Sequence, residues 1–182
     1  MAALTKVCVM VCGNSQSNVD DSNNTNSIKN LTNNSNMFAQ KITPSILVET
    51  TDARAVADYY LSIFKDSKLK DHHKYTNPSE SGSGNFETAI IEIAGMDLSI
   101  LTAGPFAKFN ESGSFVINTK DQAETDYYWT ALTSNGGQEN SCGWCKDKYG
   151  LSWQVVPIEY YDLNNSPDPK VREKAIKNTL KQ

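Results

Sequence analysis

Two stretches decide the fold: VETTDARAVADYY at residues 48–60 and VINTKDQAETDYY at residues 116–128. A Val, a Thr, an Ala and an Asp-Tyr-Tyr triplet recur between them at a constant spacing of 68 residues. In each copy an apolar strand end leads through a Thr/Asp cap into a helical pattern, and strand-like segments follow. This self-similarity predicts two packed copies of one strand–helix–strands unit. Chance similarity between two amphipathic helices is the alternative.

Hydrophobic patterns around the two copies predict the remaining elements. An apolar stripe at i, i+3, i+4, i+7, i+8 and i+11 runs from Ala53 to Phe64 and predicts the first helix. Asp121 and Glu124 stand at capping-box spacing and begin a second helix at 121–132. Strands are expected at 42–49, 68–75, 86–94, 96–102, 114–118, 141–145 and 151–156, and a closing helix at 167–181.

The first forty residues differ in composition from the rest. Residues 13–36 contain nine Asn and five Ser, and such a segment cannot bury enough apolar surface to offset the entropy of ordering it. We therefore expect a disordered Asn/Ser-rich tail at 1–40 and one domain at 41–182. No secretory or mitochondrial signal pattern is recognised, which predicts a cytoplasmic protein.

Composition excludes several functional classes. Among 182 residues, 17 Lys and Arg stand against 21 Asp and Glu, which argues against a nucleic-acid partner because phosphates require clustered basic residues. No apolar run approaches the length of a membrane span. Four cysteines are too few for a disulfide scaffold. We expect a small organic ligand, no nucleic acid and no membrane.

Six segments carry a resemblance to a known family: KITP (41–44), YYLSIFKDSK (59–68), GPFAKFN (104–110), DQAE (121–124), CGWCKDK (142–148) and SWQVVP (152–157). In this order they resemble the PhnB-like group of the vicinal oxygen chelate superfamily, which includes glyoxalase I, extradiol dioxygenases and bleomycin-resistance proteins. The resemblance implies an α+β fold of two βαβββ units in tandem with a C-terminal helix, and a homodimer. Domains of this group also carry a 3-demethylubiquinone-9 3-methyltransferase label. No G-x-G-x-x-G turn opening a helix supports that label here.

Enzymes of this superfamily usually hold a divalent metal with His and Glu side chains. At the corresponding positions this chain has poor ligands, namely Ser45 or its neighbour Pro44, Ser114 and Gln154. The two histidines, His72 and His73, are adjacent and would point to opposite faces of a strand. The sequence therefore predicts no catalytic metal and no cofactor, and it leaves open whether the chain is an enzyme.

A C-x-x-C motif at Cys142–Cys145 is the second candidate for chemistry. In redox proteins this motif opens a helix that lowers the pKa of the thiol. Here the residues that follow, 146–150, predict a turn into a strand. A structural role is therefore favoured over a redox one.

These arguments leave a small-molecule site in a cavity between two open sheets. We expect polar contacts from Gln154, Ser114 and Asn118, because alternation places Gln154 on the face where the family has a ligand Glu. The aromatic walls and further contacts are expected from Trp144, Trp153, Phe106, Lys108 and Asn110, the last two by resemblance alone. Two other classes stay open. One is a metal-dependent lyase or isomerase of the glyoxalase type using Glu87 or Glu92, and the other is a regulatory or scaffold protein acting through its Asn-rich tail.

Overall fold

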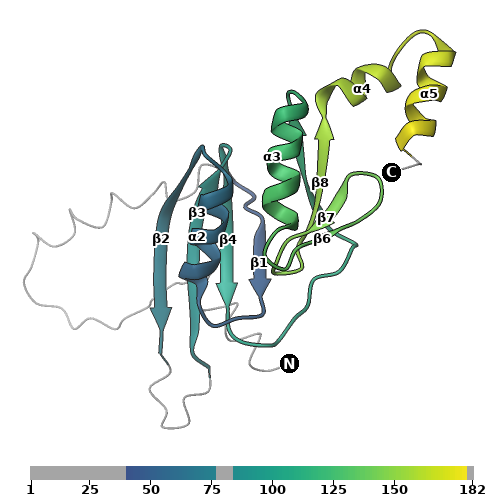
Figure 1. Ribbon diagram of the computed structural model, residues 1–182. Coiled ribbons are helices and arrows are strands. Elements are labelled where there is room, and N and C mark those ends of the chain that lie inside the picture. The colour runs from purple at the N-terminus through teal and green to yellow at the C-terminus, as the bar shows by residue number, and fades with distance from the viewer. Residues whose placement is uncertain (1–39, 77–83, 180–182) are drawn as a thin grey trace, which may run out of the picture.

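The computed structural model describes residues 40–76 and 84–179. Residues 1–39 of the predicted tail at 1–40 therefore lie outside the described residues, as does most of the loop at 77–84. The first unit consists of β1 (Ser45–Val48), α2 (Ala53–Ile63), β2 (Ser67–Tyr75), β3 (Phe86–Ile93) and β4 (Met96–Thr102). The second consists of β5 (Ser114–Thr119), α3 (Gln122–Thr133), β6 (Gln138–Glu139), β7 (Trp144–Lys146) and β8 (Ser152–Pro157). Two helices, α4 (Ile158–Asn164) and α5 (Pro169–Thr179), end the described chain (Figure 1).

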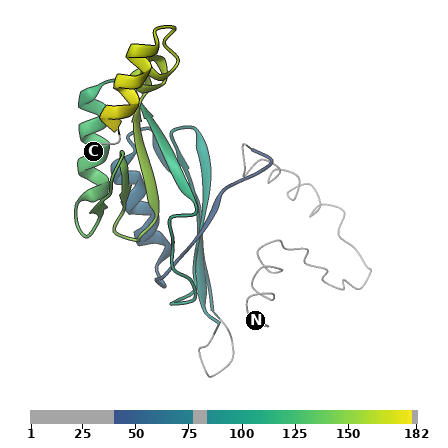
Figure 2. The ribbon, with the colours of Figure 1, turned by 90° about the vertical axis from the view of Figure 1, so that its right-hand side faces the viewer.

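Each unit forms a four-stranded sheet with the same topology. The strand orders are β1-β4-β3-β2 and β5-β8-β7-β6, with the first strand of each unit parallel to its last and the other pairs antiparallel. Helices α2 and α3 lie on the same side of the two sheets (Figures 1 and 2). The structure confirms the predicted α+β fold of two βαβββ units. Each sheet has one face covered by helices and a second, which we call its open face.

Local sequence explains where the two helices begin. Asp52 precedes α2 and accepts a hydrogen bond from the Ala55 amide at 2.8 Å. Asp121 does the same for the Glu124 amide at 2.9 Å. Both caps satisfy amides that lack partners inside the helix.

Structurally equivalent residues of the two units are separated by one residue more than the sequence repeat indicates. Ser45 and Ser114 begin the equivalent strands β1 and β5, and they lie 69 residues apart rather than 68. The two N-caps, Asp52 and Asp121, have the same separation. Because side chains alternate along a strand, a shift of one residue reverses the face. Val48 is accordingly in the core at 1% exposed, whereas Val116 lies on an open face at 46% exposed.

One hydrophobic core joins the two units. It combines α2 and the inner face of the first sheet with Leu132, Cys145, Leu151, Trp153 and Val155 of the second unit. Helix α2 contributes Tyr60, whose hydroxyl donates to the buried Asp147 carboxylate at 2.9 Å. The units therefore pack through their helix-covered faces, and both open faces are left outside this core.

The structure adds two elements that the sequence patterns did not predict. Strand β6 has two residues, too few to show alternation, and α4 has seven, about two turns. The closing helix is confirmed as α5. No helix in the described ranges is long and apolar enough to cross a lipid bilayer.

Candidate ligand site on the second sheet

Two of the expected site residues meet on the open face of the second sheet. Gln154 of β8 donates from Nε2 to the Ser114 hydroxyl of β5 at 2.8 Å. Both side chains are half-buried. In this pair of parallel strands Ser114 lies opposite Ser152, and Val116 lies opposite Gln154. The two strands therefore direct a hydroxyl and an amide to one place.

An aromatic and an apolar side chain flank this pair. Trp144 of β7 lies directly opposite Gln154 in the antiparallel ladder, so the two residues share a face. On the other side of Gln154, the exposed Val116 side chain supplies an apolar surface. Trp144 thus lies where the sequence analysis expected a wall, and Gln154, Ser114 and Trp144 form one group.

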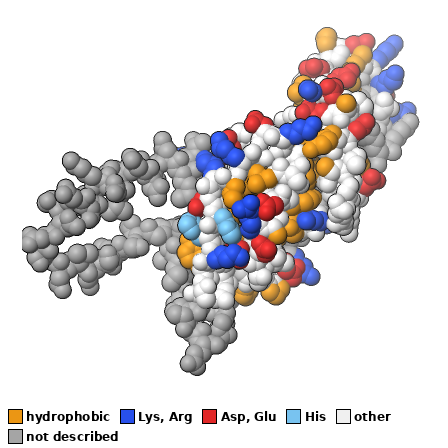
Figure 3. Space-filling model, turned by 60° about the vertical axis from the view of Figure 1, so that its left-hand side comes forward, with side chains coloured by type: hydrophobic (Ala, Val, Ile, Leu, Met, Phe, Trp, Pro, Cys, Tyr) orange, Lys and Arg blue, Asp and Glu red, His pale blue; other side chains and the backbone are white. Residues whose placement is uncertain are grey.

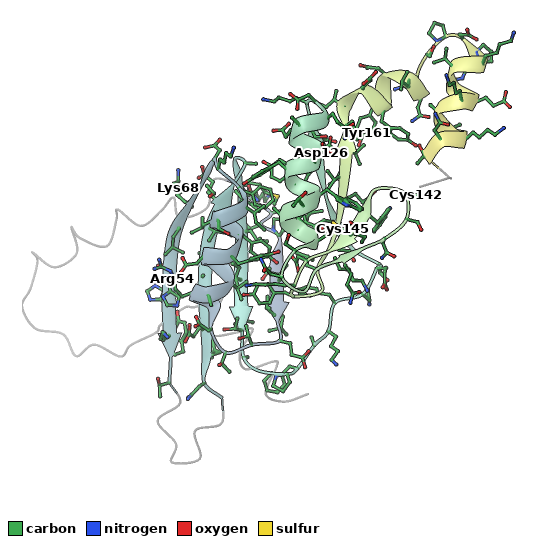
Figure 4. All side chains as sticks on the ribbon, viewed as in Figure 1. Arg54, Lys68, Asp126, Cys142, Cys145 and Tyr161 are labelled. Carbon is green, nitrogen blue, oxygen red and sulfur yellow. The ribbon has the colours of Figure 1, made fainter. Side chains whose placement is uncertain are left out.

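Asn118 marks the far end of the same face. It is exposed and lies two positions beyond Val116 on β5, so alternation keeps it on the open face. Its neighbour Thr119 points the other way and contacts Thr125 of α3 through their hydroxyls at 2.6 Å. The Asn118 side-chain oxygen accepts a hydrogen bond from the Tyr161 hydroxyl of α4 at 3.2 Å. Tyr161 was missed by sequence reasoning, because the short α4 gave no pattern and only the fold brings it to β5 (Figure 4).

Trp153 lies on the opposite face from Gln154 and does not line this site. Its side chain is 2% exposed and contacts the rings of Tyr60, Phe64 and Phe115. The indole N–H donates to Asp147 at 2.9 Å. The reason is alternation along β8, which sends adjacent residues to opposite faces. The expectation that both Trp144 and Trp153 form walls is therefore corrected to Trp144 alone.

The Asp147 carboxylate is the electrostatic centre of the buried side. It accepts hydrogen bonds from the Tyr60 hydroxyl, the Trp153 indole and the backbone amides of Tyr149 and Leu151. Burial raises the pKa of Asp147, although these four donors act against the shift. Burial, with the charge of Asp147, also raises the pKa of Tyr60 well above its usual value. Every carboxylate oxygen is hydrogen-bonded, so this cluster joins the two units and offers no free group for catalysis.

The three residues expected from the 103–113 connection have exposed side chains. Phe106 is 61% exposed, and Lys108 is exposed as well. The side-chain oxygen of Asn110 accepts from the Ser112 amide at 2.9 Å and stabilises a turn. An ion pair between Glu111 and Lys146 holds the connection beside β7. Phe106, Lys108 and Asn110 remain predicted contacts.

The donor set of the open faces does not fit a catalytic divalent ion. Ser45, Ser114 and Gln154 supply neutral oxygens and an amide, whereas Zn²⁺ and similar ions require imidazole, thiolate or carboxylate ligands. Among residues 40–76 and 84–179 no three His, Cys, Asp or Glu side chains converge as a metal site. Glu87 faces α2 and accepts a hydrogen bond from the Ala53 amide, whereas Glu92 faces the other way and pairs with Lys68. These two carboxylates cannot ligate one ion.

The two histidines also lie on opposite sides of β2. His72 contacts Glu87 at 3.1 Å, and His73 contacts Asp71 at 3.0 Å. Figure 3 shows charged side chains of both signs gathered around them. Both histidines have carboxylate partners, and neither faces the Gln154 group.

The C-x-x-C motif occupies a β-turn. Cys142 has a positive φ of 60° at the tip between β6 and β7, and the Trp144 amide closes the turn onto the Ser141 carbonyl. Cys145 points into the core, where burial, with the charges of Asp147 and Glu139, raises the pKa of its thiol to about 12. Both are free cysteines (Figure 4). The motif continues into strand β7 and not into a helix, so it lacks the helix N-terminus that redox motifs use.

A hollow of about 370 Å³ lies elsewhere, beside the N-terminus of α3. It is lined by Lys65, Lys120, Asp121, Ala123, Glu124, Tyr127 and Tyr128. The carboxylates of Asp121 and Glu124 already cap this helix end. We therefore place the candidate site on the open face and not in this hollow.

Comparisons with known proteins agree with this architecture. The model of the family described as 3-demethylubiquinone-9 3-methyltransferase matches residues 40–156. A PhnB protein from Bacillus cereus with the same description has 22% identity and a TM-score of 0.55, over 65% of this chain and 99% of that chain. Protein PA1353 from Pseudomonas aeruginosa has 17% identity and a TM-score of 0.53, over 65% of this chain and 98% of that chain.

At these identities the solved structures show the fold alone. No curated protein matches the chain. The family model nevertheless spans more than half of the 182 residues. The chain belongs to the family described as 3-demethylubiquinone-9 3-methyltransferase.

Proposed function

We propose that this protein binds a small organic molecule on the open face of its second sheet, without a catalytic metal. The Gln154–Ser114 hydrogen bond carries the proposal, because it fixes an amide and a hydroxyl side by side on a partly exposed face. Trp144 supplies an aromatic surface next to them, and Val116 supplies an apolar one. Apolar walls with a few converging polar groups are typical of small-ligand sites.

We do not propose a methyltransferase activity for this protein, although the family description contains that word. Nucleotide-derived cofactors are commonly held by glycine-rich turns between a strand and a helix. The described chain has two such strand–helix connections, at 49–52 and 120–121, and neither contains glycine. The Ser-Gly-Ser-Gly segment noted in the sequence lies at 81–84, mostly outside the described residues.

The two other classes receive less support. A metal-dependent lyase or isomerase using Glu87 or Glu92 would need these carboxylates to converge, and they lie on opposite faces of β3. A role for the Asn-rich tail concerns residues outside the described ranges. We keep the small-molecule site as the main proposal.

We further propose that the protein is a cytoplasmic homodimer. Among residues 40–76 and 84–179, both sheet helices lie on the other side of the second sheet from its open face, and a second copy would enclose a ligand there between sheets. The free thiols of Cys142 and Cys145 agree with a reducing compartment. Light scattering after size-exclusion chromatography tests the dimer, and a mass of one chain at micromolar concentration would contradict it.

Native mass spectrometry of the untagged full chain, purified without chelators, tests the binding proposal. We expect a metal-free protein that retains an organic adduct, and we expect Gln154→Leu to lose this adduct. Gln122→Leu is the matched control, because Gln122 is exposed on α3 and bonds only to Asp126 among the described residues. Stoichiometric metal, or an adduct unaffected by Gln154→Leu, would contradict the proposal.

A further inference from the structure

The C-terminal helices lie outside the part of the chain that the family model matches. That match ends at residue 156, and α4 begins at Ile158 directly after β8. Helices α4 and α5 pack on each other and project beyond the end of the second sheet (Figures 1 and 2). This helical hairpin is therefore an addition to the family domain, placed next to the strand that carries Gln154.

One side chain ties the hairpin to the candidate site. The Tyr161 hydroxyl donates to the Asn118 side-chain oxygen at 3.2 Å, and the Tyr161 side chain is 44% exposed. Asn118 lies on the same face of β5 as Ser114 and Val116. Tyr161 thus lies over the end of the open face, opposite the end held by the Gln154–Ser114 pair.

The open face consequently has a polar pair at each end. Ser114 and Asn118 are four residues apart on one strand, which corresponds to about 13 Å. In each pair one hydrogen bond joins the two partners. Within the described ranges, the Gln154 and Tyr161 oxygens, the Ser114 hydroxyl proton and the Asn118 amino group make no other hydrogen bond. Each end therefore offers a ligand at least one donor and one acceptor.

The surface between the two pairs is apolar and uncharged. Val116 lies between the ends, Val156 lies opposite Asn118, and Trp144 borders the Gln154 end. Among the described residues of β5, β7 and β8, the charged side chain on this face is Lys146, which is paired with Glu111. A charged ligand would lose its hydration without gaining a counter-charge, whereas a neutral one would lose little.

We propose that Tyr161 makes the C-terminal hairpin part of the ligand site, and that this site takes a neutral, flat organic molecule with a hydrogen-bonding group at each end. The inference rests on the proposed function and adds a binding residue and a ligand class to it. Tyr161 acts with Asn118 at one end of the molecule, and Gln154 acts with Ser114 at the other. Contacts at both ends would select ligands by length as well as by polarity.

Calorimetric titration of the full chain with 4′-hydroxybiphenyl-4-carboxamide tests the inference. This probe is neutral, consists of two planar rings in line, and carries a donor and an acceptor at its amide end. We expect Tyr161→Phe to weaken binding about two- to tenfold, the range for one lost hydrogen bond. Tyr160→Phe, which removes the same atom from the neighbouring ring of α4, is the matched control and leaves the affinity unchanged. The carboxylate counterpart, 4′-hydroxybiphenyl-4-carboxylate, is expected to bind at least about tenfold more weakly because the described residues of β5, β7 and β8 offer it no unpaired cation.

The outcomes separate this inference from the proposed function. Unchanged affinity in Tyr161→Phe together with loss in Gln154→Leu would overturn the role of the hairpin and leave the binding face intact. Unchanged affinity in both variants would mean that the probe binds elsewhere and would overturn both proposals. Equal binding of amide and carboxylate, or no binding of the amide to the wild-type chain, would overturn the ligand class.

Discussion

The two units share one topology but use their helices differently. Helix α2 buries Ala53, Val56, Ala57, Tyr60 and Ile63, whereas α3 buries only Leu132. The reason is position, because α2 packs on its own sheet and also reaches Trp153 and Asp147 of the second unit. The first unit therefore contributes most of the buried helical side chains of the shared core. The second unit contributes the Asp147 carboxylate, which accepts the hydrogen bond from Tyr60.

The open faces differ even more than the helices. In the first sheet Lys70 pairs with the fully buried Asp97 at 2.9 Å, and Lys68 pairs with Glu92 at 3.2 Å. In the second sheet the corresponding region carries the uncharged Gln154, Ser114 and Asn118. Charges that are already paired gain little from a ligand, whereas neutral donors and acceptors remain available. This difference supports our proposal that the second unit carries the binding face, with the first as its framework.

Removing the carboxylate that joins the units should have the largest effect. Asp147→Leu leaves the Tyr60 hydroxyl, the Trp153 indole and two backbone amides without their acceptor. We expect a loss of about 3–5 kcal/mol in the free energy of unfolding, because several buried donors become unsatisfied. Urea denaturation followed by far-UV circular dichroism measures it. A loss below about 1 kcal/mol would show that the two units do not depend on this cluster.

The one-residue correction of the repeat can be tested by matched substitutions. Val48→Ala removes a core side chain and should cost about 2 kcal/mol, whereas Val116→Ala removes an exposed one and should cost less than about 0.5 kcal/mol. The sequence repeat of 68 treats these two valines as equivalent, and the structural repeat of 69 does not. Equal losses in thermal or urea unfolding would contradict the observed register.

A smaller effect than that of Val48→Ala is expected at the edge of the first sheet. Glu87 accepts hydrogen bonds from Lys74, His72 and the Ala53 amide. Burial acts to raise its pKa, but these donors outweigh burial and hold the pKa below its ordinary value of 4.5. The ionised group therefore stabilises the fold above pH 4.5, and this contribution is lost as the pH falls through the lower folded-state pKa.

Glu87→Gln should accordingly cost about 1–2 kcal/mol at pH 7 and progressively less below pH 4.5. Melting temperatures measured between pH 7 and pH 3 give the difference between variant and wild type. Glu159→Gln, an exposed carboxylate of α4 with no ion pair in the described ranges, is the control. A difference that grows on acidification would contradict the assigned contacts.

Periodicity was sufficient to predict most of the fold. The apolar stripe from Ala53 and the cap at Asp121 placed both helices within one or two residues. Strand β1 was predicted at 42–49 and is shorter, at Ser45–Val48. The repeat was found one residue out of register, because matching letters carry no information about which face a side chain takes. Only strand pairing supplies that information.

The site was partly predictable from the alternation of side chains along a strand. Alternation along β8 was enough to place Gln154 on the open face, and the same rule, applied to its neighbour, places Trp153 in the core. Tyr161 and the Tyr60–Asp147 bond required the fold, because each joins elements far apart in sequence. No local pattern marks such contacts.

The central claim is that the second sheet, not the first, carries the binding face. Titrating the ¹⁵N-labelled full chain with 4′-hydroxybiphenyl-4-carboxamide and following its amide resonances tests this claim residue by residue. We predict that shifts concentrate on β5, β7, β8 and α4, with β1–β4 unchanged. Shifts centred on β1–β4, or around the hollow at the start of α3, would contradict it.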